Sequence, residues 1–272
     1  MHRSLRLRSG GGSISFALGM PADEALDWLP VGDAAAALTS NAARQYGPAP
    51  ATLKCGIARL QELRGIEADP DRTFVTSGSQ HALSLIARLL LREGGCVFTT
   101  EFAYPNFHEL ARQCRVTVVP AVTTDVDLSA LEEALTTHGR PALIYVMSLG
   151  HNPTGRSMSR AAIERIVGFA EDCGALVVDD DPYGLVSYTP ERPSFVATGS
   201  DSVAGIGTLS KTLMPSLRTG WIDTSPALVS RLGAVREAAE IDTATVGHHL
   251  AASILDRIDI DRHVDRLAGF YR

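Results

Sequence analysis

From Thr73 onward, the chain alternates short β-branched or apolar runs with longer amphipathic stretches. This alternation limits the fold more than any other feature, because repeated strand–helix units favour a parallel sheet covered by helices. We predict an α/β fold with α-β-α layers and a mostly parallel central sheet. The expected strands are 74–76, 97–99, 117–120, 143–147, 176–179, 203–205 and 220–223, and the expected helices are 51–63, 80–91, 106–113, 128–136, 160–173 and 227–240.

The chain has 272 residues, 45% hydrophobic and 21% charged, which suffices for one large domain or for one large and one small domain. Its net charge of -6 argues against a broad surface for nucleic acid or anionic lipid. No apolar run approaches the roughly 20 residues that a membrane-spanning helix requires. We therefore expect a small-molecule ligand, no nucleic-acid partner and no membrane insertion.

The four cysteines, Cys55, Cys96, Cys114 and Cys173, are scattered, with no C-x-x-C pair and no close histidine. This spacing indicates neither a zinc site nor a disulfide framework. We interpret them as buried thiols in a reducing compartment and predict a cytoplasmic protein without bound metal. Residues 1–18 carry arginines but no long apolar core, so we expect a Gly-rich tail or arm there rather than a targeting peptide.

Polar residues stand directly after several of the expected strands. In open α/β sheets, ligands bind at the carboxyl ends of the strands, so residues there are the first candidates for function. The candidates are Thr76-Ser77-Gly78-Ser79-Gln80, Tyr104, Asn152-Pro153-Thr154-Gly155, Asp180 with Tyr183, and Thr208-Leu209-Ser210-Lys211. We expect the fold to bring these segments together.

The segment 76–80 joins an expected strand to an expected helix. The free N–H groups and partial positive charge of a helix N-terminus bind anions, so Ser79 and Gln80 could hold a phosphate. A serine at this place can equally be an ordinary helix cap. These residues alone do not decide between the two interpretations.

Three consecutive acids, Asp179, Asp180 and Asp181, follow an apolar strand. Adjacent carboxylates repel one another, and burial adds a desolvation cost, unless a cation compensates at least one of them. A protonated pyridine nitrogen would be such a cation.

Lysine is scarce: the chain has 25 Lys and Arg residues, and only two of them, Lys54 and Lys211, are lysines. Lys211 follows an expected strand, close in sequence to Thr208, Ser210 and Arg218. A lysine among so many arginines indicates a need for an amine that can deprotonate and attack a carbonyl, which arginine cannot do. Lys54 lies in an expected helix, where we interpret it as part of a solvated face.

Taken in order, these segments resemble the class I/II aminotransferases, which are pyridoxal-phosphate (PLP) enzymes of fold type I. The resemblance is greatest to the branch with the α-aminoadipate and kynurenine aminotransferases and the effector domains of MocR-type regulators. It covers nearly the whole chain. The matching segments are Gly19-Met20-Pro21, Gln45-Tyr46-Gly47, Thr76-Ser77-Gly78-Ser79-Gln80, Asn152-Pro153-Thr154-Gly155, Asp180-Asp181-Pro182-Tyr183 and Ser210-Lys211-Thr212.

The resemblance implies a fold-type I large domain with PLP as its cofactor, and it implies roles for individual residues. Lys211 would form the internal aldimine and later move a proton between the substrate Cα and the cofactor. Asp180 would pair with the pyridinium nitrogen and keep the ring able to accept electrons. Tyr183 and Asn152 would hydrogen-bond the phenolic oxygen, and Tyr104 would lie against the ring face.

The resemblance also implies a phosphate cradle and a second subunit. The implied phosphate ligands are Ser79, Gln80, Thr208, Ser210 and Arg218. In the family, the counterpart of Tyr46 reaches the phosphate of the neighbouring subunit, which predicts a homodimer.

Two details depart from the family pattern near the site. The usual acid-Pro-x-Tyr segment appears here as Glu101-Phe102-Ala103-Tyr104, which weakens the match at Tyr104. His151 precedes Asn152, and we expect it to be a histidine with satisfied hydrogen bonds rather than a catalytic one.

The domain organisation that the resemblance implies is a tail over 1–18, a PLP-binding large domain over 19–257 and, over 258–272, the start of the helix that leads into a small domain. In relatives the small domain supplies the arginine that grips the substrate α-carboxylate, and no residue here matches it by motif. We therefore expect apolar surface within 246–260 to be open or covered by a partner. We also expect the chain alone to transaminate free amino acids feebly.

The first functional hypothesis is a PLP-dependent aminotransferase (transaminase) that acts on an amino acid and a 2-oxo acid through a quinonoid intermediate. Because this fold also hosts lyases, decarboxylases and oxidases, the second is another PLP enzyme acting on an unusual amine. The third is a non-catalytic PLP-binding sensor or a remnant. The sequence does not identify the amino donor or acceptor.

Overall fold

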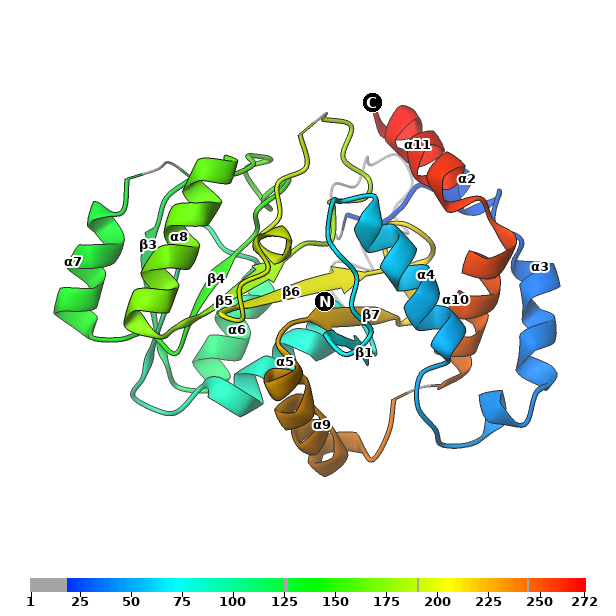
Figure 1. The fold of residues 1–272 in the computed structure, drawn as a ribbon, viewed down its shortest axis with the longest axis horizontal. Coiled ribbons are helices and arrows are strands. Elements are labelled where there is room, and N and C mark those ends of the chain that lie inside the picture. The colour runs from blue at the N-terminus through cyan, green and yellow to red at the C-terminus, as the bar shows by residue number, and fades with distance from the viewer. Residues whose placement is uncertain (1–18, 125–126, 190, 244) are drawn as a thin grey trace, which may run out of the picture.

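The computed structural model describes residues 19–124, 127–189, 191–243 and 245–272, so the expected tail over 1–18 lies outside the described residues. The described part contains a seven-stranded sheet with helices on both faces (Figure 1). The strand order is β1-β7-β6-β5-β4-β2-β3. The strands are β1 (Thr73–Thr76), β2 (Cys96–Thr100), β3 (Thr117–Val122), β4 (Leu143–Val146), β5 (Leu176–Asp180), β6 (Val203–Thr208) and β7 (Gly220–Asp223).

Five neighbouring strands, from β3 to β6, run parallel, whereas β7 is antiparallel to both β6 and β1. The predicted mostly parallel sheet is therefore confirmed. The largest boundary difference is at β6, which continues to Thr208 instead of ending at Gly205. Glycine weakens a strand pattern in the sequence, but Gly207 is needed here, because a Cβ atom on it would lie 2.2 Å from the Trp221 ring.

Alternate strand residues face different helices, which gives the molecule its three layers (Figure 1). Val97 packs in the core with α5 (Ser79–Leu90) and α6 (Pro105–Gln113), on the face that α9 (Pro226–Glu240) also covers. Its neighbour Phe98 packs in the opposite core, below α7 (Ser129–His138) and α8 (Arg160–Cys173). This period of two is what places successive residues of β5 in different environments.

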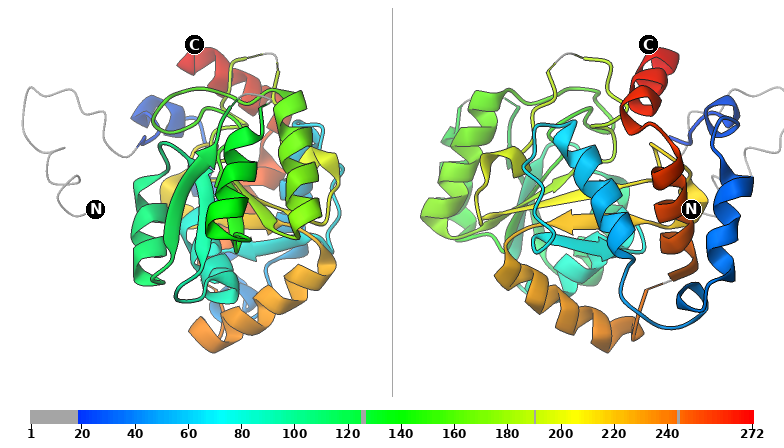
Figure 2. Two further views of the ribbon diagram at one scale, coloured as in Figure 1. Left: turned by 90° about the vertical axis from the view of Figure 1, so that its left-hand side faces the viewer. Right: turned by 45° about the vertical axis from the view of Figure 1, so that its right-hand side comes forward.

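A third core lies at the β1–β7 end of the sheet, where Figures 1 and 2 show a group of helices beside the strands. The group comprises α2 (Asp23–Leu26), α3 (Val31–Ala34), α4 (Ala51–Glu62) and α10 (Thr245–Arg257), with 3₁₀ turns at Ala35–Thr39 and Ala42–Arg44. Further 3₁₀ turns lie at Val196–Thr198 and Pro215–Leu217.

The expectation of open apolar surface within 246–260 is wrong for most of that segment. The segment forms α10, and its apolar residues Ala251, Ile254 and Leu255 are buried in the same core as α4. The two helices approach closely, because a Cβ atom on Gly56 would lie 2.7 Å from Leu255 Cδ1. The chain's own α4 therefore covers most of the surface that we expected to be open or covered by a partner, and Val246, 52% exposed, is the main exception.

Helix α11 (Ile260–Tyr271) forms within the expected segment 258–272. The Asp259 side chain accepts a hydrogen bond from Arg262 N at 3.1 Å and so caps the helix. Figure 2 shows α11 beside α2, and the backbone N–H of Ala22 donates to the Tyr271 hydroxyl at 3.2 Å. The C-terminal helix is thus tied to the first described residues.

The four cysteines are free thiols, but the expectation that all are buried is wrong, since Cys55 is exposed and only Cys96 is fully buried. None of the described helices is long and apolar enough to cross a membrane. Within the same residues, no group of three or more His, Cys, Asp or Glu side chains is arranged to hold a metal ion.

The burial of α10 predicts a specific loss of stability. Ile254→Ala should lower the free energy of unfolding by about 2–5 kcal/mol, because the side chain is fully buried and its removal leaves a cavity. Val246→Ala, on the exposed start of the same helix, should change it by about 0.5 kcal/mol or less. Urea unfolding of both variants measures the difference. Equal effects of the two substitutions would show that α10 is not packed as described.

Candidate active site

The strand ends of β5 and β6 bring together the central predicted residues, Asp180, Tyr183 and Lys211. Asp180 is the last residue of β5, and Lys211 follows β6 by three residues. Lys211 Nζ lies 6.0 Å from the centroid of the Tyr183 ring and donates a hydrogen bond to Gly19 O at 2.5 Å. Burial lowers the pKa of the Lys211 amine. The N-terminal Gly19 segment thus forms one side of the site.

The three consecutive acids have three different surroundings. Asp179 accepts hydrogen bonds from Ser148 N at 2.9 Å, Ser148 Oγ at 2.8 Å and Phe195 N at 3.4 Å. Asp181 accepts from Gly184 N and forms a buried ion pair with Arg64. The cation that we expected near these carboxylates is thus supplied to Asp181 by the chain itself.

Asp180 is the acid with an unpartnered oxygen. It is 4% exposed; its Oδ2 accepts a hydrogen bond from the Tyr145 hydroxyl at 2.8 Å, while Oδ1 has no hydrogen-bond partner among the described residues. The pKa of Asp180 is raised to about 6, mainly by burial; the hydrogen bond from the Tyr145 hydroxyl opposes this increase, and the charge of Asp181 adds to it. A carboxylate in this state would be stabilised by a cationic hydrogen-bond donor at Oδ1, as a protonated pyridine nitrogen is.

Sequence reasoning missed Tyr145, which lies on β4 opposite Val178 of β5. Its ring stacks on Phe107 with centroids 3.9 Å apart, which fixes the hydroxyl toward Asp180. The strand register would have indicated this contact, because Tyr145 lies opposite Val178 and therefore on the same face of the sheet as Asp180.

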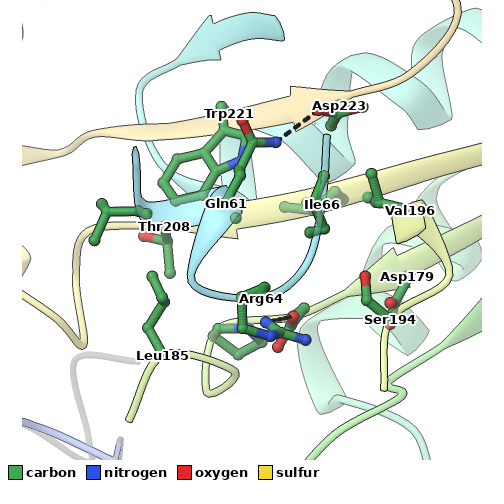
Figure 3. A pocket seen from close by; sticks show the side chains of 16 residues that line it. Gln61, Arg64, Ile66, Asp179, Leu185, Ser194, Val196, Thr208, Trp221 and Asp223 are labelled. Atoms are coloured by element: carbon green, nitrogen blue, oxygen red, sulfur yellow. Dashed lines mark hydrogen bonds and ion pairs between the residues drawn. The ribbon is translucent and has the colours of Figure 1, made fainter. Parts of the chain in front are cut away.

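Arg64 was also missed, since it is one of many arginines and lies in the turn just after α4, far from Asp181 in sequence. A cavity of about 40 Å³ beside this ion pair is drawn in Figure 3. Arg64 and Gln61 both line that cavity. Their buried atoms Arg64 Nε and Gln61 Oε1 have no hydrogen-bond partner among the described residues. A space of this size suits one or a few bridging water molecules rather than a cofactor.

The segment between β1 and α5 has the geometry of an anion-binding loop. Helix α5 begins at Ser79, so the cap residue is Gly78 and not the serine that the alternative interpretation required. No side chain caps the helix. Gly78 has φ = +98°, and a Cβ atom there would lie 2.5 Å from an Arg218 nitrogen, so the guanidinium lies directly over the loop. Both the uncapped N–H groups and the cation favour an anion at this place.

The other predicted phosphate ligands lie near the same strand ends. The Thr208 hydroxyl donates to Ser210 Oγ at 3.0 Å and also lies 3.3 Å from Thr219 O. Gln80 Oε1 accepts from Asn106 Nδ2 at 3.3 Å, and Asn106 also donates to the Tyr104 hydroxyl at 2.9 Å. Asn106 was not predicted, and it links the loop to the tyrosine expected against the ring.

Tyr183 and Tyr104 stand in one electrostatic neighbourhood with Asp180. Burial raises the pKa of both phenols, and the Asp180 carboxylate raises each further. A hydrogen bond with the Asn152 side chain partly offsets this increase for Tyr183. His151 is satisfied as expected, since Nε2 lies 2.8 Å from Phe102 O and Nδ1 lies 2.9 Å from Thr154 Oγ1.

Two predicted features lie outside this cluster. Tyr46 is 80% exposed, so its ring packs against little of its own chain. Lys54 is half-buried, in contrast to the expected solvated position, and its amine donates to Pro70 O at 2.9 Å.

A cleft of about 410 Å³ opens beside Lys211 and Tyr183. Most of its wall is apolar, and arginine is absent from the described residues that line it. The other lining residues are Gly19, Met20, Pro21, Leu149, Gly150, Gly155, Ser157, Val186, Ser187, Tyr188, Thr189 and Tyr271.

A half-buried lysine, a buried carboxylate with an unpartnered oxygen and an uncapped helix N-terminus beside an arginine together fit a PLP enzyme of fold type I. The family of aminotransferases class I and II matches residues 14–269, nearly the whole chain. The chain belongs to this family, whose cofactor is pyridoxal phosphate.

Individual relatives agree with this assignment. The chain is 29% identical to the 2-aminoadipate transaminase of Thermus thermophilus over 98% of its own length and 69% of that protein. Among solved structures, it resembles the α-aminoadipate aminotransferase LysN of the same organism, complexed with N-(5'-phosphopyridoxyl)-L-leucine (TM-score 0.85, 28% identity, 98% of this chain and 70% of that one). The multiple substrate aminotransferase of Thermococcus profundus is equally similar in fold (TM-score 0.85, 26% identity, 99% and 70%). The predicted family, fold type and cofactor are thereby confirmed.

The surroundings of the acids predict opposite effects on the cofactor-free protein. Because the pKa of Asp180 is raised on folding, its contribution to stability is present below about pH 4 and is lost as the pH rises through about 6. Asp180→Asn should therefore raise the free energy of unfolding by about 1–3 kcal/mol above pH 6, and by less at lower pH.

Asp181→Asn is the matched control, because it leaves the buried Arg64 guanidinium without its counterion. It should lower the free energy of unfolding by about 3–5 kcal/mol at neutral pH. Urea titrations at several pH values measure both effects. A loss of stability in Asp180→Asn similar to that in Asp181→Asn would mean that Asp180 Oδ1 is paired in the folded chain.

Proposed function

We propose that this chain is a PLP-dependent aminotransferase that uses Lys211 to bind the cofactor and exchanges an amino group between an amino acid and a 2-oxo acid. The observation that carries the proposal is the unpartnered, buried Oδ1 of Asp180 in the same cluster as Tyr183 and Lys211. Among the alternatives of the fold, the named aminotransferases among the relatives favour transamination over lyase, decarboxylase or oxidase activity.

When bound, PLP supplies an aldehyde carbon that condenses with amines and a conjugated ring that accepts electron density from the substrate Cα. Lys211 is the residue that would hold it covalently. Burial lowers the pKa of its amine, which increases the neutral fraction able to attack a carbonyl. Once the substrate amine has displaced it, Lys211 would carry a proton from and to the substrate Cα as general base and acid.

The remaining predicted residues would bind and orient. Asp180 Oδ1 would accept a hydrogen bond from the protonated ring nitrogen, and this contact would hold the proton there. The Tyr183 hydroxyl and the Asn152 side chain would hydrogen-bond the ring oxygen, with Tyr104 against the ring face. The residues that would hold the phosphate are Ser79, Gln80, Thr208, Ser210 and Arg218. The amino-acid side chain would enter the apolar cleft beside Lys211.

We also propose that the protein is a homodimer in the cytoplasm. Tyr46, Ile241 and Val246 are exposed, and they lie beside two contacts that join their segments, Gly47 N to Asp242 Oδ2 and Thr245 Oγ1 to Gln45 O. A second copy covering this apolar surface would bring Tyr46 to the phosphate of its neighbour. The free thiols support a reducing compartment.

We propose a PLP-binding domain over 19–257, followed over 258–272 by a helix that corresponds to the one leading into the small domain of relatives. Helix α11 and its contact with Ala22 support it.

Borohydride reduction of the PLP-loaded protein, followed by peptide mapping, tests the covalent attachment. We expect the pyridoxyl group on Lys211 and none on Lys54, whose amine contacts Pro70 O and lies outside the cluster of Asp180, Tyr183 and Lys211. The control variant Lys54→Arg should keep full labelling. Labelling of Lys54, or of neither lysine, would overturn the proposed function.

A second test measures exchange of the substrate Cα hydrogen with deuterated solvent. Asp180→Asn should slow this exchange by about 10²–10³-fold while the pyridoxyl adduct on Lys211 still forms, because a neutral amide does not stabilise a protonated ring nitrogen. Asp180→Glu should retain more of the rate, since it keeps the charge. A normal exchange rate in Asp180→Asn would show that another group contacts the ring nitrogen.

A further inference from the structure

The backbone of the loop before α5 is held by side chains from three different elements. The imidazole of His81, on α5, accepts a hydrogen bond from Ser77 N through Nδ1 at 3.0 Å. His248, on α10, lies with Nε2 3.3 Å from Thr76 O. Arg218 donates to Ser77 O at 3.2 Å. These contacts fix the strand end and the two residues before the helix, so the first N–H groups of α5 have a defined direction.

His81 is the third residue of α5, where many helices carry Glu or Gln that reaches back to a backbone N–H group near the cap. The imidazole makes the corresponding contact here, to the residue before the cap Gly78. The difference is in charge. A glutamate at this position would stabilise the helix N-terminus by itself, but it would repel an anion that binds there.

The hydrogen bonds of His81 require a neutral ring. Because Ser77 N–H donates to Nδ1, that nitrogen carries no proton, and the proton is on Nε2, which faces Glu240 of α9 at 3.3 Å. The pKa of His81 is lowered to about 4, mainly by burial and in addition by the charges of Arg236, Arg88 and His248. Glu240 would favour a charged ring, but a second ring proton would leave the Ser77 N–H without its acceptor.

We propose that His81 is a positioning residue: a neutral hydrogen-bond acceptor that orients the Ser77–Gly78 backbone for an anionic phosphate at the start of α5 without adding a negative charge. The proposal rests on the proposed function, in which that anion is the cofactor phosphate. One further observation supports an anionic ligand at this site, namely the Arg218 guanidinium over Gly78. The unpartnered, buried Oδ1 of Asp180 instead calls for a cationic donor and supports the cofactor as a whole.

Three variants separate charge from hydrogen bonding. His81→Gln keeps a neutral acceptor, His81→Glu keeps an acceptor but adds a charge, and His81→Leu removes the acceptor. Glutamate is well tolerated at this helix position, so the charged variant should fold. The cofactor-free proteins are titrated with PLP and, in parallel, with pyridoxal, which has the same aldehyde and ring but no phosphate.

We expect His81→Gln to bind PLP within about threefold of the parent, and His81→Glu to bind it about 5–30-fold more weakly. Pyridoxal binding should be the same in the parent and in His81→Glu, and added salt should reduce the PLP difference. His81→Leu should weaken PLP binding and speed hydrogen exchange of the Ser77 N–H. ¹⁵N chemical shifts of the His81 ring should show an unprotonated Nδ1 at neutral pH.

Equal PLP affinity in His81→Glu and the parent would overturn the proposal. So would an equal loss of PLP and pyridoxal binding, which would place the effect on the fold or on Lys211 instead of on the phosphate. These outcomes leave the proposed function intact. A parent protein in which Lys211 captures no PLP at all would overturn the proposed function, and this inference with it.

Discussion

The site depends on how one strand end distributes three consecutive carboxylates. Left together in a buried place, Asp179, Asp180 and Asp181 would repel one another and would share the cost of desolvation. The period of the strand turns Asp179 toward Ser148 and Phe195, where three donors satisfy it, and Arg64 neutralises Asp181. Asp180 alone of the three keeps an oxygen without a partner among the described residues. An acceptor oxygen is thus held at a defined point, while the oxygens of the two neighbouring carboxylates already have partners.

At the other end of the site, the groups carry positive instead of negative charge. The start of α5 is uncapped, Arg218 lies over Gly78, and the acceptor that holds the loop is a neutral imidazole instead of a carboxylate. Lys211 stands in the same cluster with an amine whose pKa is lowered by burial. A ligand with an anionic group at one end, a cationic nitrogen at the other and a carbonyl between them matches this arrangement, and PLP has these three features. The electrostatic pattern therefore agrees with the cofactor of the family without depending on any single residue.

Local sequence patterns predicted most of the scaffold and the residues of the motifs. Each expected strand is present, because β-branched runs bounded by turn residues rarely form anything else in an α/β chain. Lys211 stood out by the scarcity of lysine, and the resemblance to the family, through the segment Asp180-Asp181-Pro182-Tyr183, implied Asp180 among three adjacent acids. Two of the residues that sequence reasoning missed act across long separations, Tyr145 through the strand register and Arg64 through its ion pair with Asp181. His81 acts through a side-chain contact to a backbone group four positions earlier. His81 stands at a helix position for which a local capping pattern is known, whereas the contacts of Tyr145 and Arg64 have no local pattern and could be found only from the fold. The burial of α10 was missed for the same reason, since its apolar residues pair with α4, which lies nearly 200 positions earlier.

The supporting residues explain how a site with unsatisfied charge is compatible with a stable chain. A buried carboxylate with a raised pKa and an uncapped helix N-terminus both lower the stability of the fold. The contacts around these two groups keep them from moving to more favourable positions. Phe107 stacks on Tyr145 and holds its hydroxyl at Asp180, while His248 and His81 hold the loop from two helices. Phe107 and Tyr145 belong to one apolar core, and His248 lies on α10, whose apolar residues belong to another. Moving either charged end would therefore disturb a packed core and not only rotate a side chain. A ligand that pairs with both ends would recover the free energy that the folded chain lacks without it, so cofactor affinity and the stability of this part of the fold should be linked. Because the same two ends would align the ring next to Lys211, the residues that make the site costly are also those that would orient the reacting atoms.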